Sequence, residues 1–229
     1  MNSHTLLLFD IDGTLVLYRD DFPHRMFEEM TSMFFDRPVS LADYRFSGKT
    51  DKLIISEVSA LAGVTATELE SREADIVEWI PKRLEEHIDE STFELLPNVR
   101  SILDQLAARP NTTLALLTGN LPRCAELKLG QFGLMKYFEF GAYGIESRDR
   151  NDLGPIALRK FQESKGFEPS DVVIVGDALP DIHVAKHIDA RVLVTLTGRT
   201  TRDEVLPHEP DHIFDDLTNT EAVLQAIYG

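Results

Sequence analysis

Four short, almost continuously apolar runs alternate with helix-like stretches, and this alternation limits the folds open to the chain. Runs that are apolar on both faces are typical of parallel strands covered on both sides. The helical patterns between and before them lie at Val99–Ala108, Arg123–Phe132, Ile156–Lys165 and Asp181–Ile188. The order predicts an α/β fold, a Rossmann-like parallel sheet flanked by helices and built from right-handed βαβ units. The predicted strands are Thr5–Phe9, Thr113–Leu117, Val172–Val175 and Arg191–Thr195, with weaker candidates at Phe138–Ala142 and His212–Phe214.

The segment from about Tyr18 to Thr92 interrupts this alternation and shows no convincing strand. Its apolar residues recur at helical spacing, and Thr65 with Glu68 forms a capping box that predicts a further helix running toward Trp79. Pro81 is expected to kink or end that helix, because proline lacks the backbone N–H. We therefore predict an all-helical domain over residues 18–92, inserted into a core formed by residues 1–17 and 93–229.

The net charge and the cysteine content of the chain limit the molecules to which it can bind and the compartment in which it is expected. The chain has 229 residues and a formal net charge of −16, which disfavours binding to nucleic acid and to anionic membranes. A phosphorylated ligand would then need a local metal ion, lysine or arginine. The single cysteine excludes an intrachain disulfide, and the N-terminus lacks the pattern of a secretory signal, so a cytoplasmic location is expected.

Two carboxylates stand directly after the first predicted strand, in the segment Asp10-Ile11-Asp12-Gly13-Thr14. Side chains at positions i and i+2 of an extended chain share one face, so Asp10 and Asp12 are expected to enter the same space. Two carboxylates this close repel each other unless a cation or a proton separates them. The segment therefore predicts a metal site with a chemical role.

Two other predicted strands also end in polar motifs. Thr118-Gly119-Asn120 follows the second strand, and Asp177 and Asp181 form a Gly-Asp-x-x-x-Asp arrangement after Val172–Val175. Ligands of open α/β sheets bind outside the carboxyl ends of the strands. Turn chemistry could explain any one motif alone, but three at one edge of a sheet indicate a functional site.

These segments resemble a known family. DIDGT at 10–14, LLTGN at 116–120 and VVIVGDALPD at 172–181 are similar to motifs I, II and IV of the haloacid dehalogenase superfamily. The resemblance covers almost the whole chain and is nearest to the phosphoglycolate-phosphatase-like phosphohydrolases. The helical insert matches the position of the family's C1 cap. The resemblance implies Mg²⁺-dependent hydrolysis of a small phosphorylated metabolite, such as phosphoglycolate, a sugar phosphate or a nucleotide.

The resemblance also assigns roles to the acidic residues. Asp10 would attack phosphorus and form an aspartyl-phosphate, and Asp12 would protonate the leaving oxygen and then accept a proton from water. Asp181 would orient metal-bound waters or the loop. The Mg²⁺ ligands would be the carboxylates of Asp10 and Asp177 and the backbone carbonyl of Asp12.

The phosphoryl group would meet the hydroxyl of Thr118 and the backbone amides of Gly119 and Asn120. The family's motif III normally supplies a lysine to the phosphate, but no Lys-Pro occurs in the matching region. Arg150 is our candidate replacement, with Arg148 as the second choice, because arginine can bind phosphate through two donors.

Two other functions stay open at this point. A phosphomutase of the same superfamily would share these core residues and return the phosphoryl group to a sugar. A catalytically weak phosphoryl-binding protein would be consistent with the missing lysine. The sequence also leaves open whether the protein is a monomer or a homodimer.

Overall fold

A six-stranded, all-parallel sheet forms the centre of the core in the computed structural model, which describes residues 4–229. The strand order is β5-β4-β1-β6-β7-β8, so β1 lies in the interior of the sheet. The predicted fold class is confirmed, although the weak candidate at Phe138–Ala142 is displaced toward the C-terminus. The strands are β1 (Thr5–Phe9), β4 (Thr112–Thr118), β5 (Gly141–Tyr143), β6 (Asp171–Gly176), β7 (Arg191–Thr195) and β8 (His212–Phe214).

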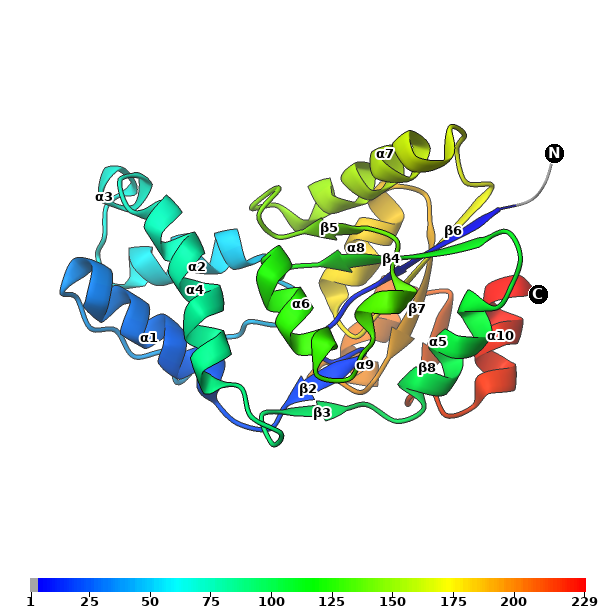
Figure 1. Ribbon diagram of the computed structural model, residues 1–229, viewed down its shortest axis with the longest axis horizontal. Helices are drawn as coiled ribbons and strands as arrows, with labels where there is room; N and C mark the ends of the chain where they lie inside the picture. Colours follow the sequence, from blue (N-terminus) through cyan, green and yellow to red (C-terminus); the bar gives the residue numbers. More distant parts are fainter. Residues whose placement is uncertain (1–3) are drawn as a thin grey trace.

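Helices cover both faces of this sheet (Figure 1). Leu7 and Phe9 of β1 pack in one apolar cluster, and the alternate residues Leu6 and Leu8 pack in another, as expected for a strand buried on both faces. The first cluster contains residues of α5 (Val99–Ala107), α6 (Pro122–Gly130) and α10 (Thr220–Tyr228). The second contains residues of α7 (Leu153–Lys165), α8 (Leu179–His187) and α9 (Arg202–Val205).

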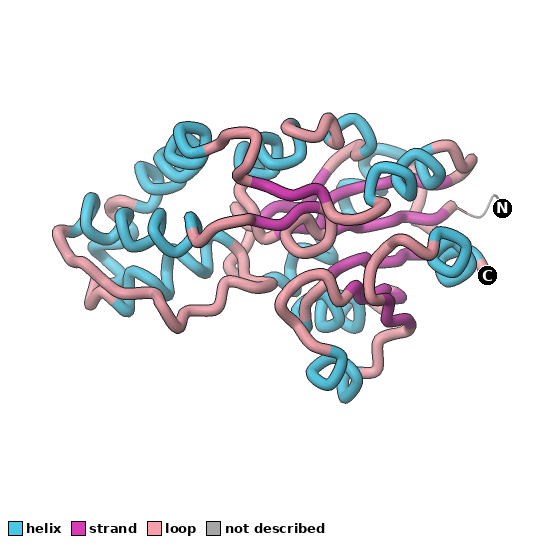
Figure 2. Tube along the Cα trace, turned by 90° about the horizontal axis from the view of Figure 1, so that it is seen from below, coloured by secondary structure: helices cyan, strands magenta, loops and turns pink. Residues whose placement is uncertain are grey.

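A separate group of four helices lies beyond the end of the sheet at which β1 ends (Figures 1 and 2). Most members of a third apolar cluster belong to these helices, among them Phe22, Met30, Ile55 and Ile76. The sequence-predicted helical insert thus has an apolar cluster, which Phe93, Leu121 and Cys124 of the other part of the chain also join. Its helices are α1 (Phe22–Phe35), α2 (Asp51–Leu61), α3 (Ala66–Glu70) and α4 (Glu73–His87).

Two short strands flank the insert, β2 (Val16–Tyr18) before it and β3 (Phe93–Leu95) after it, and they pair antiparallel. No strand was predicted between Tyr18 and Thr92, and both strands lie at the edges of that segment. Because they pair with each other, the two points at which the chain enters and leaves the insert lie side by side.

Of the two outcomes expected at Pro81, a kink or an end of the helix, the structure excludes the end. Helix α4 continues through Pro81 to His87, and the capping box at Thr65 opens the separate short helix α3. Ile76, Ile80 and Leu84 are all buried on one face of α4, so the packing of the insert extends past the proline and outweighs its local cost.

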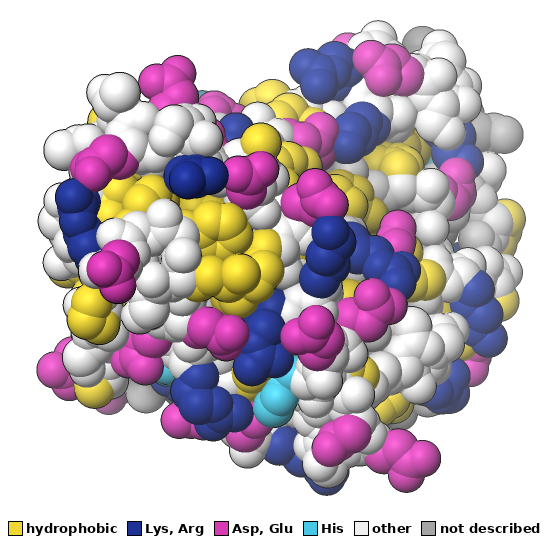
Figure 3. All heavy atoms as spheres, turned by 60° about the vertical axis from the view of Figure 1, so that its left-hand side comes forward, with side chains coloured by type: hydrophobic (Ala, Val, Ile, Leu, Met, Phe, Trp, Pro, Cys, Tyr) yellow, Lys and Arg dark blue, Asp and Glu magenta, His cyan; other side chains and the backbone are white. Residues whose placement is uncertain are grey.

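The surface on the insert side carries both signs of charge. Acidic and basic side chains are interspersed there around an area of hydrophobic side chains (Figure 3). Within residues 4–229, no helix is both long and apolar enough to span a membrane.

Candidate active site

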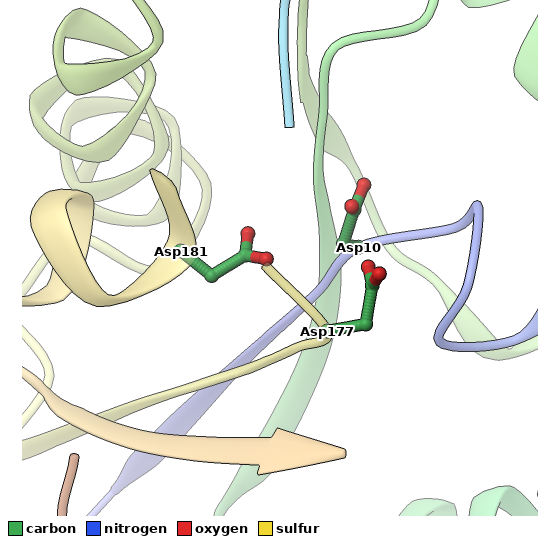
Figure 4. A group of neighbouring side chains, drawn as sticks. All are labelled: Asp10, Asp177 and Asp181. Atoms are coloured by element: carbon green, nitrogen blue, oxygen red, sulfur yellow. The ribbon is translucent and has the colours of Figure 1, made fainter. Parts of the chain in front are cut away.

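Three buried carboxylates meet at the carboxyl end of the sheet (Figure 4). Asp10 follows β1, Asp177 follows β6, and Asp181 lies in the first turn of α8. One carboxylate oxygen of each lies within 4.8 Å of the others. The neighbouring parallel strands β1 and β6 end side by side, and this pairing brings residues far apart in the sequence together.

The Asp177 carboxylate fits into the site because Gly13 and Gly198 have no side chains. A Cβ atom on Gly13 would contact the Asp177 carboxylate closely, and one on Gly198 would overlap its Oδ2 atom. Gly13 also has a φ of +83°, a conformation that glycine adopts without strain. The loop after β7 therefore belongs to the wall of the site, which the sequence analysis did not predict.

We expect Gly198→Ala to lower activity by about 100-fold, because the added methyl group must displace the Asp177 carboxylate and small displacements of catalytic groups carry costs of this order. Gly130→Ala is the matched control, since a Cβ there meets no atom within 4 Å. Steady-state kinetics of the two variants, with circular dichroism to verify folding, test this. Equal activities in the two variants would contradict the role of Gly198.

Arg150 bridges two of the three carboxylates. Its Nη2 atom lies 3.2 Å from Oδ2 of Asp10 and 2.6 Å from Oδ1 of Asp181. Its Nη1 donates to the backbone carbonyl of Gly48 at 3.3 Å, and its buried Nε has no partner within the described residues. The structure thus places Arg150 against the predicted nucleophile.

Arg148, the second choice, lies elsewhere. Its guanidinium is about half exposed and pairs with Glu73 of α4 at 3.0 Å. The backbone carbonyl of Arg148 accepts a hydrogen bond from Thr50 at 2.9 Å. Arg148 therefore connects the core to the insert and does not join the acidic cluster.

The cluster has a surplus of negative charge. Burial raises the pKa of Asp10 to about 6 although the charge of Arg150 opposes this shift. Burial, followed by the charge of Asp10, raises the pKa of Asp177 well above its ordinary value. Three carboxylates and one guanidinium leave two formal negative charges, which a divalent cation would neutralise. Oxygen donors alone suit Mg²⁺, so the residues present fit this ion.

The raised pKa values predict how the stability of the Mg²⁺-free protein depends on pH. An acid with a higher pKa in the folded state binds its proton more tightly when folded, so protonation stabilises the fold. The free energy of unfolding should therefore fall as pH rises from about 4 through 6. Mg²⁺ should counteract this loss, because it neutralises the ionised carboxylates.

Thermal unfolding at pH 5 and pH 8, with and without Mg²⁺, tests this prediction. The midpoint should rise more on adding Mg²⁺ at pH 8 than at pH 5, and Asp177→Asn should reduce that difference. Burial also raises the pKa of Asp51 to about 6, so the response to Mg²⁺ and not the pH profile alone reports on the cluster. A larger gain from Mg²⁺ at pH 5 would contradict the prediction.

Asp12 does not point into this cluster. Both of its carboxylate oxygens accept hydrogen bonds from Nζ of Lys128 at 2.7 Å, and Oδ2 also accepts one from Nδ2 of Asn120 at 2.7 Å. The two carboxylates that were expected to share one space thus have different partners, Arg150 for Asp10 and Lys128 with Asn120 for Asp12. Burial alone would lower the pKa of Lys128, yet the charge of Asp12 keeps it above the ordinary value.

Lys128 was missed by the sequence analysis. It lies on the inward face of α6 beside Cys124, Ala125 and Leu129, and only 4% of its surface is exposed. A lysine that takes a position of the apolar stripe is the signal that could have identified it, because buried lysines are rare without a partner.

The residues of the second motif close another side of the site. Thr118 is buried at the end of β4, and its hydroxyl accepts a hydrogen bond from Nδ2 of Asn120 at 2.8 Å. A Cβ on Gly119 would overlap the backbone carbonyl of Lys49, so the insert lies directly on this loop.

Asp51 makes the same connection. Its backbone N–H donates to the carbonyl of Gly119 and its carboxylate accepts from the N–H of Leu121, both at 2.7 Å. A cavity of about 470 Å³ lies between the insert and the core, and Asp10, Asp12 and Asp177 are not among its lining residues. Its lining comes from both parts of the chain and includes Lys49, Leu53, Arg148, Arg150 and His183.

A model of the family described as haloacid dehalogenase-like hydrolase matches residues 4–189. The chain belongs to this family. The matched residues contain all three motifs, and the fold brings these motifs to one edge of the sheet.

Proteins similar to this chain include two curated phosphatases. A phosphoglycolate phosphatase from Vibrio vulnificus is 24% identical over 212 residues, which cover 93% of this chain and 92% of the relative. Phosphoglycolate phosphatase 1 from Pseudomonas aeruginosa is 26% identical, with coverage of 93% and 76%. Both alignments therefore include the insert as well as the core.

Solved structures share the fold. The crystal structure of a predicted phosphoglycolate phosphatase from Haemophilus somnus 129pt superposes with a TM-score of 0.72 at 21% identity, covering 98% of this chain and 100% of that one. A structure from Thermotoga maritima, named as a candidate β-phosphoglucomutase, gives a TM-score of 0.62 at 18% identity, with coverage of 98% and 99%. At these identities the similarity concerns the fold.

Proposed function

We propose that this chain is a Mg²⁺-dependent phosphomonoester hydrolase that acts through an aspartyl-phosphate on a small phosphorylated metabolite. The observation that carries the proposal is the meeting of Asp10, Asp177 and Asp181 with Arg150 at the carboxyl end of the sheet. The curated phosphoglycolate phosphatases that match more than nine-tenths of the chain support a substrate of the class of phosphoglycolate, a sugar phosphate or a nucleotide.

Asp10 is the proposed nucleophile. Its carboxylate oxygen forms a bond to phosphorus while the bond from phosphorus to the leaving oxygen breaks. Asp12 donates a proton to that oxygen, and its side chain is 38% exposed, so a substrate can reach it. The bound Mg²⁺, held by Asp10, Asp177 and the backbone carbonyl of Asp12, would supply positive charge to the phosphoryl oxygens.

Other residues would bind the phosphoryl group or support those that do. Arg150 would donate to its oxygens and keep Asp10 in place. The hydroxyl of Thr118 and the backbone N–H groups of Gly119 and Asn120 would face the remaining phosphoryl oxygens. Asp181, whose Oδ2 accepts from the N–H of Ala178 at 3.0 Å, would orient Arg150.

In the second half of the reaction, water attacks phosphorus and the bond from phosphorus to Asp10 breaks. Asp12 accepts the proton of the water, and the Asp10 carboxylate is regenerated. The leaving group would lie beside Asp12, where the side chain of that residue is exposed.

A substrate panel tests the proposal. Release of inorganic phosphate is measured from phosphoglycolate, hexose phosphates, nucleoside monophosphates and p-nitrophenyl phosphate, with Mg²⁺ and with a chelator. We expect release from at least one compound, and only with Mg²⁺. A protein that binds vanadate but releases no phosphate from any of them would be a phosphoryl-binding protein.

A phosphomutase is the second candidate, because the superposed structure from Thermotoga maritima is named for that activity. The two activities differ in the fate of the phosphoryl group. Incubation with a hexose phosphate separates them, since a hydrolase releases free phosphate while a mutase forms the isomeric phosphate.

A further inference from the structure

We propose that Lys128 is a positioning residue that holds the Asp12 carboxylate in the orientation required for proton transfer. This inference rests on the proposed function, in which Asp12 donates a proton to the leaving oxygen and then accepts one from the attacking water. Lys128 comes from helix α6, which carries no residue of the three motifs.

The ammonium group of Lys128 is fully engaged at the site. Nζ donates to Oδ1 and Oδ2 of Asp12 at 2.7 Å each and to Oδ1 of Asn120 at 2.6 Å. These contacts use the three donors of an ammonium group. The ring of Tyr18 lies on the same group, with its centroid 4.7 Å from Nζ.

Packing alone does not account for a lysine at this position. Its neighbours on the inward face of α6, Cys124, Ala125 and Leu129, are apolar and buried. A methionine would fill similar space without the cost of removing an ammonium group from water. All three hydrogen bonds of Lys128 go to the side chains of Asp12 and Asn120, so its charge acts on residues of the site.

The same contact fixes the amide of Asn120. Because its Oδ1 accepts from Lys128, its Nδ2 faces Oδ2 of Asp12 at 2.7 Å and the hydroxyl of Thr118 at 2.8 Å. Lys128 and Asn120 together hold the Asp12 carboxylate with three donors. A carboxylate offers about four lone-pair positions, so one remains for the proton that passes to the leaving oxygen and is later taken from water.

Without Lys128, only Asn120 would hold the partly exposed Asp12 side chain, which could then adopt other rotamers. Proton transfer to the leaving oxygen would then slow, while the attack of Asp10 on phosphorus would be less affected. During the reaction Lys128 keeps its proton, and the proton that reaches the leaving oxygen comes from Asp12.

The experiment compares leaving groups. The ratio kcat/KM covers only the steps through departure of the leaving group, and p-nitrophenolate leaves without protonation whereas an alkoxide requires it. Lys128→Met should therefore lower kcat/KM for an alkyl phosphate such as phosphoglycolate by about 10- to 100-fold, but by no more than about 3-fold for p-nitrophenyl phosphate.

Further variants isolate the interaction with Asp12. Asp12→Asn should show the same selective loss, and adding Lys128→Met to it should cause no further loss, because the two changes remove one interaction. Lys128→Arg should restore most of the activity, since a guanidinium can also donate to both carboxylate oxygens. Lys136→Met is the matched control, a change of an exposed lysine that lies over Tyr137.

Three results would overturn the role of Lys128 while the wild type remains active: equal losses for both substrates, losses that multiply in the double variant, or a raised KM with weaker inhibition by vanadate. The last would mean that Lys128 binds the phosphoryl group itself. A wild type that releases phosphate from no compound of the substrate panel would overturn the proposed function together with this inference. If Lys128→Met does not fold, Lys128→Gln offers a second uncharged replacement.

Discussion

Replacing Asp10 by asparagine is expected to lower Mg²⁺-dependent phosphate release by about 10⁴-fold or more, the order of loss seen when a nucleophile is removed from an enzyme. An amide cannot form the aspartyl-phosphate, and it also withdraws one of the charged oxygens proposed to hold Mg²⁺. The measurement is the rate of release from p-nitrophenyl phosphate, because this leaving group depends least on Asp12.

Asp36→Asn is the control for this variant. Asp36 ends helix α1 with a φ of 54°, in the left-handed region that asparagine tolerates well, and it lies in the insert. Its activity should equal that of the wild type. If Asp10→Asn retained activity within about tenfold, the reaction would not proceed through Asp10, because no nucleophile would remain at that position.

The second large effect is expected for Arg150→Ala. Arg150 is 6% exposed and lies between two carboxylates, so its loss should reduce kcat/KM by about 10²- to 10³-fold, as for other groups that stabilise charge in the transition state. Its removal also leaves buried carboxylates without a partner. In the absence of Mg²⁺, the free energy of unfolding should fall by about 3–5 kcal/mol, measured by urea unfolding.

Arg148→Ala provides the comparison, two residues away. Its guanidinium is about half exposed and pairs with Glu73 at the surface, so the expected loss of stability is below about 1 kcal/mol and catalysis should change little. A larger catalytic loss for Arg148→Ala than for Arg150→Ala would reverse the assignment of the two arginines.

The strands and the edge at which the motifs meet could be predicted from the sequence. Continuous apolar runs such as Thr5–Phe9 are characteristic of strands that are buried on both faces, and their polar ends follow directly. Once β1 and β6 are parallel neighbours, Asp10 and Asp177 have to lie close together, whatever the details of packing.

The direction of the Asp12 side chain could not be predicted in this way. Local spacing places Asp10 and Asp12 on one face, but the rotamer of Asp12 depends on Lys128, which reaches it from a helix 116 positions later in the sequence. Similarly, Pro81 suggests a helix end locally, whereas the buried face of α4 extends across it. In both cases tertiary contacts decide the outcome.

The overlap that a side chain at position 119 would create has a consequence for engineering this protein. Gly119 must lack a side chain because the carbonyl of Lys49 occupies that space, and Gly144 is restricted in turn by the carbonyl of Gly119. Residues of the catalytic half are thus fitted to the backbone of the inserted half. Replacing the insert with that of another protein would preserve the loop at Gly119 only if the new segment follows the same path across it.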